Sequence, residues 1–357
     1  MATYLLYMGS PVIVYLILTV FSGRTINDNP KYRNIYLGIM FIIMSLMMGL
    51  KSPDIGSGDA RVYFSFWETM SEVSFSELNY YLQKADFEIG YQFTTWVFSH
   101  IFRNGQWQLI LSSIFFAFSV CCFVNKNCKN LYLALIAFNS LGLFNFMVQG
   151  LRQAVAMCIC LWALEFCKQK KPIKFLFFIV LATLFHGSAV VFSVVYFVRF
   201  FKLDIKSFVI TAILIILGII FLPKLFALIN KFINDNYELG NQASEGGIIA
   251  VIIYMAIILF GLVFRDREDN NYALFLYMSI MAMVAMVMRN FVSTIIERVA
   301  LYFAFGEMVV LSNSVKVIKN RTYYAVVCAF AVIMCFGVAI YKSTYSSLVP
   351  YLFFWQG

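Results

Sequence analysis

The chain alternates between long apolar stretches and short polar connections, and this alternation limits its fold more than any other feature of the sequence. A helix that crosses a lipid bilayer needs about 20 mostly apolar residues. Stretches of this kind recur along the 357 residues, at 3–22, 34–50, 106–124, 131–149, 151–167, 205–222, 248–264, 271–289, 293–312 and 322–341. They predict an all-α polytopic membrane protein with about 10–12 transmembrane helices, folded as one integral membrane domain over 1–357.

Composition supports this prediction. The chain is 62% hydrophobic and only 13% charged, with a mean hydropathy of +0.82, whereas a soluble domain carries about 25% charged residues. The first apolar run, Tyr4–Phe21, has no basic residue before it, while Arg24, Lys31 and Arg33 follow it. A secretory signal peptide has the opposite layout, so this run is expected to stay in the protein as a span.

Two regions do not fit the simple series of spans. Residues 52–105 mix acids and aromatic residues with one short apolar piece, and residues 173–199 are long and apolar but are interrupted at His186. Basic residues prefer cytoplasmic loops, and the basic loops fall on one side only if neither region crosses as a simple span. We therefore expect an external loop and short-helix elaboration at 52–105 and a re-entrant or broken-helix hairpin at 173–199.

The same topology places on the external side several charged residues that lie at the edges of apolar runs. These residues are Asp54, Asp59, Glu88, Arg152, Arg289 and Arg298, and the turn at His186 points to the same side. Ionisable residues in membrane segments are costly and usually functional. Their convergence predicts a site at the external face.

Several chemistries find no support in the sequence. The eight cysteines form no Cys-x-x-Cys pair and fall mostly in apolar runs, so they are interpreted as small apolar fillers. The chain has no Gly-x-x-x-x-Gly-Lys and no His-Glu-x-x-His motif. The net charge of +9 comes from loops between spans, which does not indicate nucleic acid. We expect no metal and no nucleotide cofactor.

Two acids are candidates for a catalytic base. Asp59 follows a glycine-containing turn, where a helix N-cap is the simpler interpretation and an accessible base is the functional one. Glu88 opens a short apolar segment, where the helix dipole alone can account for an acid, while Gly90 permits close approach of another backbone or a substrate.

Three arginines and one histidine have similar alternatives. Arg152 at the head of a span could snorkel to the interface, or it could bind phosphate oxygens. His186 could bond to a backbone carbonyl at a helix break, or it could carry a proton. Arg298 could pair with the adjacent Glu297 or face the site opposite Arg152, and Arg289 is a weaker case of the same kind.

Several short motifs, taken together, resemble the EpsG family of polysaccharide polymerases, which belongs with the Wzy-type O-antigen and capsule polymerases. In family order they are Gly58-Asp59 with Tyr63, Glu88-x-Gly90-Tyr91, Leu151-Arg152-Gln153-x-Val155-Ala156, Ala182-x-x-Phe185-His186-x-Ser188-Ala189, Arg298 with Tyr302, and Pro350-Tyr351. Lys51 stands where the pattern has an arginine.

The resemblance implies a bacterial inner-membrane glycosyltransferase of the GT-C kind with its active site facing the periplasm or exterior. It would transfer a glycan from undecaprenyl pyrophosphate to the non-reducing end of a lipid-linked repeat unit. Membrane lipid and a chain-length regulator are further expected partners. The expected catalytic residues are Asp59, Glu88 and His186, and the expected pyrophosphate ligands are Arg152, Arg298 and Arg289. The expected substrate-lining residues are Tyr63, Tyr91, Gln153, Ser188, Tyr302 and Tyr351.

Three alternatives remain at this stage. A flippase or transporter of the lipid-linked repeat unit would usually show internal repeats and charges along a path through the membrane. An O-antigen ligase would share the arginines and differ in its acceptor. A structural subunit of an export complex would not need polar residues inside apolar runs.

Overall fold

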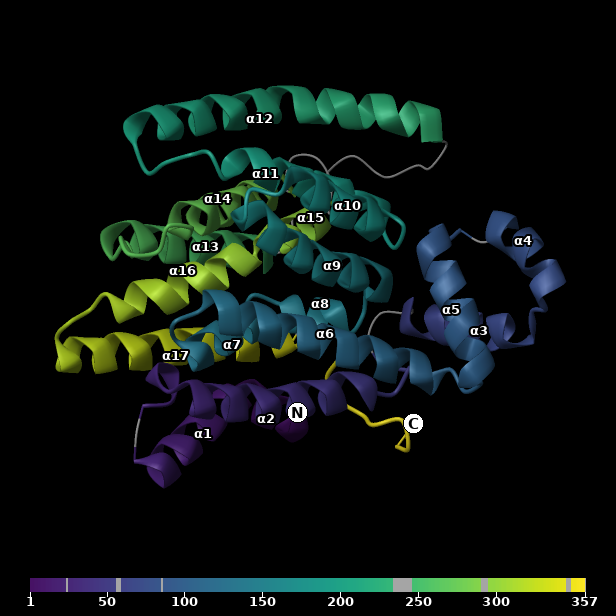
Figure 1. Cartoon of the computed structure of the whole chain (residues 1–357), viewed down its shortest axis with the longest axis horizontal. Helices are drawn as coiled ribbons and strands as arrows, with labels where there is room; N and C mark the ends of the chain where they lie inside the picture. The colour runs from purple at the N-terminus through teal and green to yellow at the C-terminus, as the bar shows by residue number, and fades with distance from the viewer. Residues whose placement is uncertain are drawn as a thin grey trace. The chain divides into compact units, whose positions relative to one another are not determined.

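The computed structural model is built from helices. It describes residues 1–23, 25–55, 59–84, 86–233, 246–289, 295–344 and 348–356. Within these ranges the one β pairing is an isolated antiparallel bridge between Lys51 and Phe353. Figure 1 shows that helices make up nearly all of the regular structure, as the apolar series predicts.

Internal contacts divide the chain into two compact units. Unit 1 comprises Met1–Ser193 and Asn320–Gly357, and unit 2 comprises Val194–Lys319. The expectation of a single membrane domain over 1–357 stays a prediction.

Unit 1 contains most of the helices. In chain order they are α1 (Ala2–Ser22), the 3-10 helix η1 (Ile26–Asp28), α2 (Pro30–Gly49), α3 (Asp59–Glu72), α4 (Phe75–Lys84), α5 (Ile89–Ile101), α6 (Gln106–Asn127), α7 (Leu131–Ser140), α8 (Leu143–Met147), α9 (Leu151–Lys168), α10 (Pro172–Thr183) and α17 (Arg321–Thr344). A 3-10 helix, η2 (Gly187–Val194), follows α10. Helix α6 packs against α2 and α9, and α10 packs against α9.

Unit 2 is centred on α16. Its helices are α11 (Val195–Val198), α12 (Ile205–Ile233), α13 (Gly246–Val263), α14 (Tyr272–Arg289), α15 (Ile295–Phe303) and α16 (Phe305–Lys316). Every residue from Phe305 to Val315 is buried, because α13 and α14 both pack against α16. Gly306 makes the approach to α14 possible, since a Cβ at this position would lie 2.6 Å from the carbonyl oxygen of Phe275.

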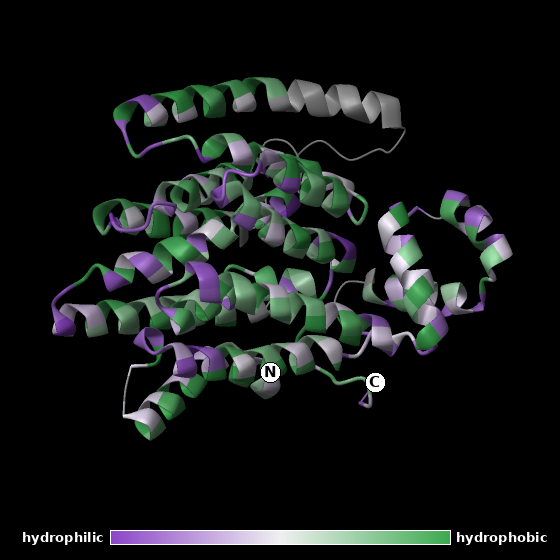
Figure 2. Cartoon of the chain, in the orientation of Figure 1, coloured by the Kyte–Doolittle hydropathy of each residue, from purple (hydrophilic) through white to green (hydrophobic). Residues whose placement is uncertain are grey.

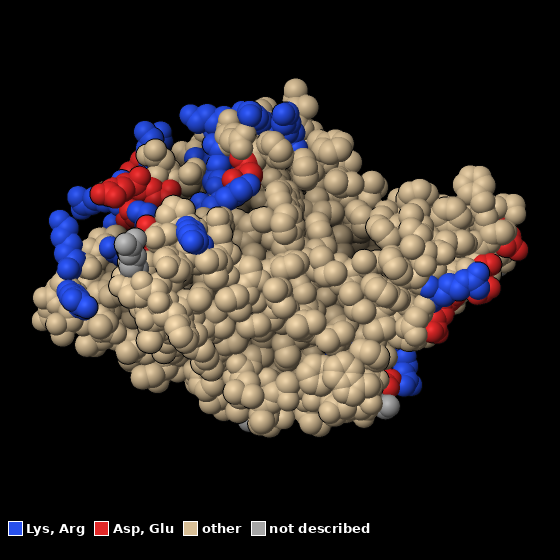
Figure 3. All heavy atoms as spheres, turned by 60° about the horizontal axis from the view of Figure 1, so that its bottom comes forward, with Lys and Arg blue, Asp and Glu red and all other residues tan. Residues whose placement is uncertain are grey.

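The described helices have the length and composition of membrane spans. Five are long and apolar enough to cross a bilayer, namely Ala2–Ser22, Pro30–Gly49, Gln106–Asn127, Tyr272–Arg289 and the Arg321–Tyr341 part of α17. Five shorter apolar helices accompany them. Apolar residues dominate the helices and polar ones gather at their ends and connections (Figure 2). On the face shown in Figure 3, charged side chains form groups separated by wide stretches without charge. The protein is an all-α polytopic membrane protein.

Two predicted spans are wrong as continuous helices. The stretch 131–149 is divided into α7 and α8 by Gly142, whose φ of 86° belongs to the left-handed region. The stretch 293–312 is divided at Ala304 into α15 and α16. Both stretches are apolar on either side of the break, so hydropathy alone could not show it.

The two irregular regions contain short helices. Residues 52–105 include α3, α4 and α5. In 173–199 the helix α10 ends at Thr183 and η2 begins at Gly187, so the interruption lies around His186. Which side of the membrane each region faces stays a prediction.

Candidate active site

Three of the predicted site residues meet in unit 1. Glu88 is the N-cap residue of α5, Arg152 is in the first turn of α9, and His186 follows the end of α10. Along the chain, Arg152 follows Glu88 by 64 residues and His186 follows it by 98 residues. The fold therefore brings together three predicted site residues that lie far apart in the sequence.

Both carboxylate oxygens of Glu88 are engaged. Oε2 forms an ion pair with Nη1 of Arg152, while Oε1 lies 2.9 Å from Nδ1 of His186 and 3.1 Å from the backbone nitrogen of Gly187. The Glu88 side chain does not cap its own helix. Glu88 therefore has specific partners in addition to its position at the start of α5.

The surroundings of Glu88 fix its charge. Partial burial opposes ionisation, but the hydrogen bond from His186 and the positive charge of Arg152 outweigh it, and the pKa of Glu88 falls from 4.5 to about 2. An ionised carboxylate can only accept hydrogen bonds, so Nδ1 of His186 must carry the proton in this pair. A neutral imidazole with Nδ1–H has its lone pair on Nε2.

Arg152 is held on three sides. Besides the ion pair, its guanidinium carbon lies 4.5 Å from the centre of the Phe87 ring, and the phenol of Tyr63 also interacts with the guanidinium. Its Nε is buried and has no hydrogen-bond partner in the described residues. The Arg152 guanidinium therefore keeps a donor that protein atoms in the described structure do not use.

Aromatic residues form the wall beside Arg152. The ring centres are 4.7–6.1 Å apart in the pairs Tyr63–Tyr91, Phe66–Phe87 and Phe66–Tyr91. Gln108, in α6, donates a hydrogen bond through Nε2 to the hydroxyl of Tyr91. Tyr63 and Tyr91, both predicted to line the site, therefore lie next to it.

A backbone contact docks α5 onto the end of α10. The backbone nitrogen of Gly90 donates to the carbonyl oxygen of Leu184 at 2.8 Å. A Cβ on Gly90 would lie 2.7 Å from that oxygen, so only glycine fits. The prediction that Gly90 allows close approach of another backbone is confirmed, and this approach brings Glu88 to His186.

The other predicted residues of unit 1 are Asp59, Gln153, Ser188 and Tyr351. Asp59 begins α3, but its side chain lies outside the described part of the structure. Gln153 is buried next to Arg152 in α9, and Ser188 lies in η2. The hydroxyl of Tyr351 donates to the carbonyl oxygen of Met47.

The other predicted cations belong to unit 2. Nε of Arg289 lies 3.0 Å from Oε2 of Glu297, so this acid pairs with Arg289 at the end of α14. Arg298 is exposed on α15, and Tyr302 is buried one turn further on. Their part in the site stays a prediction.

Lys51 lies in the interior of unit 1. It is fully buried, its Nζ donates to the carbonyl oxygen of Ile55 at 2.6 Å, and burial lowers its pKa from 10.5 to about 8. Backbone bonds from Ser52 to Leu352 and from Phe354 to Leu50 enclose it.

Sequence reasoning missed three groups at this site. Phe87 precedes Glu88 in the chain and Gly187 follows His186. Their adjacency to predicted residues could have marked them as members of the site. Gln108 lies within an expected span and has no comparable signal.

A comparison with protein families identifies the group to which the chain belongs. The EpsG family matches residues 34–353, which is most of the chain. The chain belongs to the EpsG family. Membership supports a role in polysaccharide polymerisation through a glycosyltransferase-like reaction at a membrane. Comparisons with curated proteins and with solved structures gave no match.

Proposed function

We propose that this EpsG-family protein is a polysaccharide polymerase of O-antigen, capsule or exopolysaccharide. It transfers a glycan from undecaprenyl pyrophosphate to the non-reducing end of a lipid-linked repeat unit. The reaction takes place at the external face of the bacterial inner membrane. The observation that carries the proposal is the Arg152–Glu88–His186 cluster, because it joins a cation for the leaving group to a histidine for the acceptor hydroxyl.

His186 is the base in this proposal. Glu88 holds the proton on Nδ1, so Nε2 can take the proton of the acceptor hydroxyl as its oxygen attacks the anomeric carbon. Glu88 itself has both oxygens occupied and a pKa of about 2, so we assign it to positioning rather than to proton transfer. Asp59 remains a second candidate base.

Arg152 stabilises the leaving group. The bond between the anomeric carbon and the pyrophosphate oxygen breaks, and negative charge grows on the pyrophosphate. The Arg152 side chain is 21% exposed, and a partly exposed guanidinium is suited to such charge-assisted contacts. Arg289 and Arg298 are proposed as further cations, and Tyr63, Tyr91, Gln153, Ser188, Tyr302 and Tyr351 as the lining. With cations supplied by side chains, the reaction is proposed to need neither metal nor nucleotide.

The test is polymer formation by the purified protein. Given only the lipid-pyrophosphate-linked repeat unit, in the presence of EDTA, the protein should yield a ladder of lengthening products. Arg152→Ala should reduce the rate of polymer formation by about two to three orders of magnitude. Lys31→Ala, which removes a positive charge from α2 of unit 1, is the control and should leave the rate unchanged.

Three outcomes would contradict the proposal. Long products from Arg152→Ala would remove this residue from pyrophosphate binding. Movement of the substrate between leaflets of a liposome without a ladder would favour a flippase. Transfer of preformed polymer to a different lipid acceptor would favour a ligase.

A further inference from the structure

A second site lies at the opposite ends of the unit 1 helices from the Arg152 cluster. Two lysines there rest on aromatic rings of α9. Nζ of Lys126, from the last turn of α6, lies 5.4 Å from the centre of the Trp162 ring. Nζ of Lys174, from the first turn of α10, lies 5.8 Å from the centre of the Phe166 ring.

The two rings share one face of α9. Trp162 and Phe166 are four residues apart, which places them one above the other along a helix. Helices α6 and α10 both pack against α9, one contributing each lysine. The ammonium groups therefore flank one strip of α9, and cation–π contact holds each in place before any ligand arrives.

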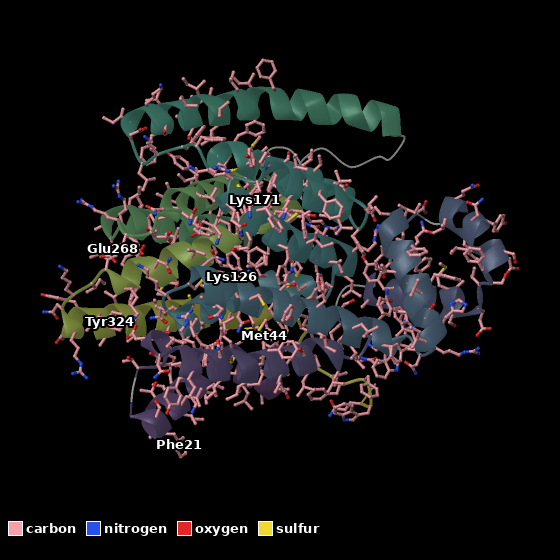
Figure 4. All side chains as sticks on the ribbon, in the orientation of Figure 1. Phe21, Met44, Lys126, Lys171, Glu268 and Tyr324 are labelled. Carbon is pink, nitrogen blue, oxygen red and sulfur yellow. The ribbon has the colours of Figure 1, made fainter. Side chains whose placement is uncertain are left out.

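The charge of this strip is not neutralised by protein. Among the described residues, Lys126, Lys170, Lys171 and Lys174 have no acidic partner, and all four are exposed. Glu165 of α9 is already paired with Lys168 at 2.9 Å. Figure 4 labels Lys126, in the last turn of α6, and Lys171, the N-cap residue of α10. An anion is the complementary ligand.

An apolar surface adjoins the lysines. Phe118 is 50% exposed and stacks with Trp162 at 5.9 Å, and Phe177 is 62% exposed beside Phe178, which contacts Phe166. A ligand that fits this strip has a negatively charged head and an apolar tail. Phospholipids with anionic head groups have this chemistry, and basic clusters next to membrane spans attract them.

We propose that Lys126 and Lys174, with Trp162 and Phe166 beneath them, form a binding site for one anionic phospholipid. The phosphate lies between the two ammonium groups, and the acyl chains lie along Phe118 and Phe177. This site is independent of the proposed transferase site, since it shares none of its residues.

The experiment is native mass spectrometry of the purified protein with added phosphatidylglycerol or phosphatidylcholine. We expect retention of phosphatidylglycerol at low salt and its loss at high salt. The double variant Lys126→Gln/Lys174→Gln should bind it on the order of thirtyfold more weakly. Lys126→Arg/Lys174→Arg, which keeps both charges, should still bind.

The matched control is Lys202→Gln/Lys206→Gln, which removes two charges from unit 2. Equal weakening by this control would show that only overall charge matters and would overturn the site. Equal retention of both lipids, or undiminished binding by Lys126→Gln/Lys174→Gln, would also overturn it. Should the glutamine variant fail to fold, Trp162→Leu/Phe166→Leu tests the same strip with all charges kept.

Discussion

The carboxylate of Glu88 receives donors from two distant parts of the chain, Arg152 on Oε2 and the His186–Gly187 segment on Oε1. An acid alone at this position would be explained by its helix. The pairing with Arg152 and His186 instead makes it the residue through which the other two are oriented. In the proposed reaction this orientation matters more than the basicity of Glu88.

The pKa of Glu88 determines how stability depends on pH. Its folded-state pKa of about 2 lies below the ordinary 4.5, so the ionised form stabilises the fold. This contribution is complete above about pH 4.5 and is lost as pH falls toward 2. We expect the Tm difference between the protein and Glu88→Gln to be largest above pH 4.5 and to vanish near pH 2.

Thermal unfolding in detergent across this pH range measures the difference. Glu72→Gln, at an exposed acid 3.7 Å from Arg103, is the matched control and should show little pH-dependent difference. A difference for Glu88→Gln that stays constant down to pH 2 would contradict the pairing.

Glu307 of unit 2 presents the opposite case. It is fully buried, and neither carboxylate oxygen has a hydrogen-bond partner in the described structure. An ionised carboxylate without donors is very costly in apolar surroundings, so we expect Glu307 to hold a proton. Glu307→Gln should leave Tm nearly unchanged, whereas Glu307→Lys should prevent folding.

Infrared spectroscopy tests this expectation directly. A carbonyl stretch of a protonated carboxyl group should be present at neutral pH and absent from Glu307→Gln. A spectrum at neutral pH that Glu307→Gln leaves unchanged would show that this carboxyl is ionised.

At the scale of elements, the contact between α5 and the end of α10 sets the geometry of the site. Gly90→Ala places a methyl group 2.7 Å from the carbonyl oxygen of Leu184 and so forces the two elements apart. We expect a lower Tm, by several degrees, and a loss of polymerase activity by at least tenfold.

Gly38→Ala is the matched control, because a Cβ on this exposed helical residue of α2 meets nothing within 4 Å. Alanine should stabilise α2 slightly, by about 0.5–1 kcal/mol. Equal effects of the two substitutions on activity would show that the close approach at Gly90 is unimportant.

The sequence predicts most of these elements because apolar length is a strong signal. It also identifies Glu88, Arg152 and His186, since each is a polar residue at the edge of an apolar segment. It does not reveal the breaks at Gly142 and Ala304, where both flanking helices are apolar. Nor does it reveal which residues pair, because pairing depends on the packing of α5, α9 and α10.

At the scale of the whole molecule, the proposed topology separates the two sites across the bilayer. Residues 52–105 should face the exterior and the lysines at the α9–α10 turn should face the cytoplasm. A cysteine at the exposed Ser74 should then react with an impermeant thiol reagent in intact cells. A cysteine at the exposed Lys171 should react only after the membrane is opened.

Background labelling should be low, because seven of the eight native cysteines are buried in the described structure. Replacing Cys122, the partly exposed one, with serine provides the starting variant. Labelling of both positions from the same side would contradict the topology and would place both sites on one face.

The Glu88 pairing also sets an order of events during synthesis. Glu88 leaves the ribosome 64 residues before Arg152 and 98 residues before His186. Until α9 and α10 have been made, its carboxylate has neither partner. The proposed transferase site is therefore completed by the arrival of a later helix, and a nascent chain that stops before residue 186 lacks one of its three residues.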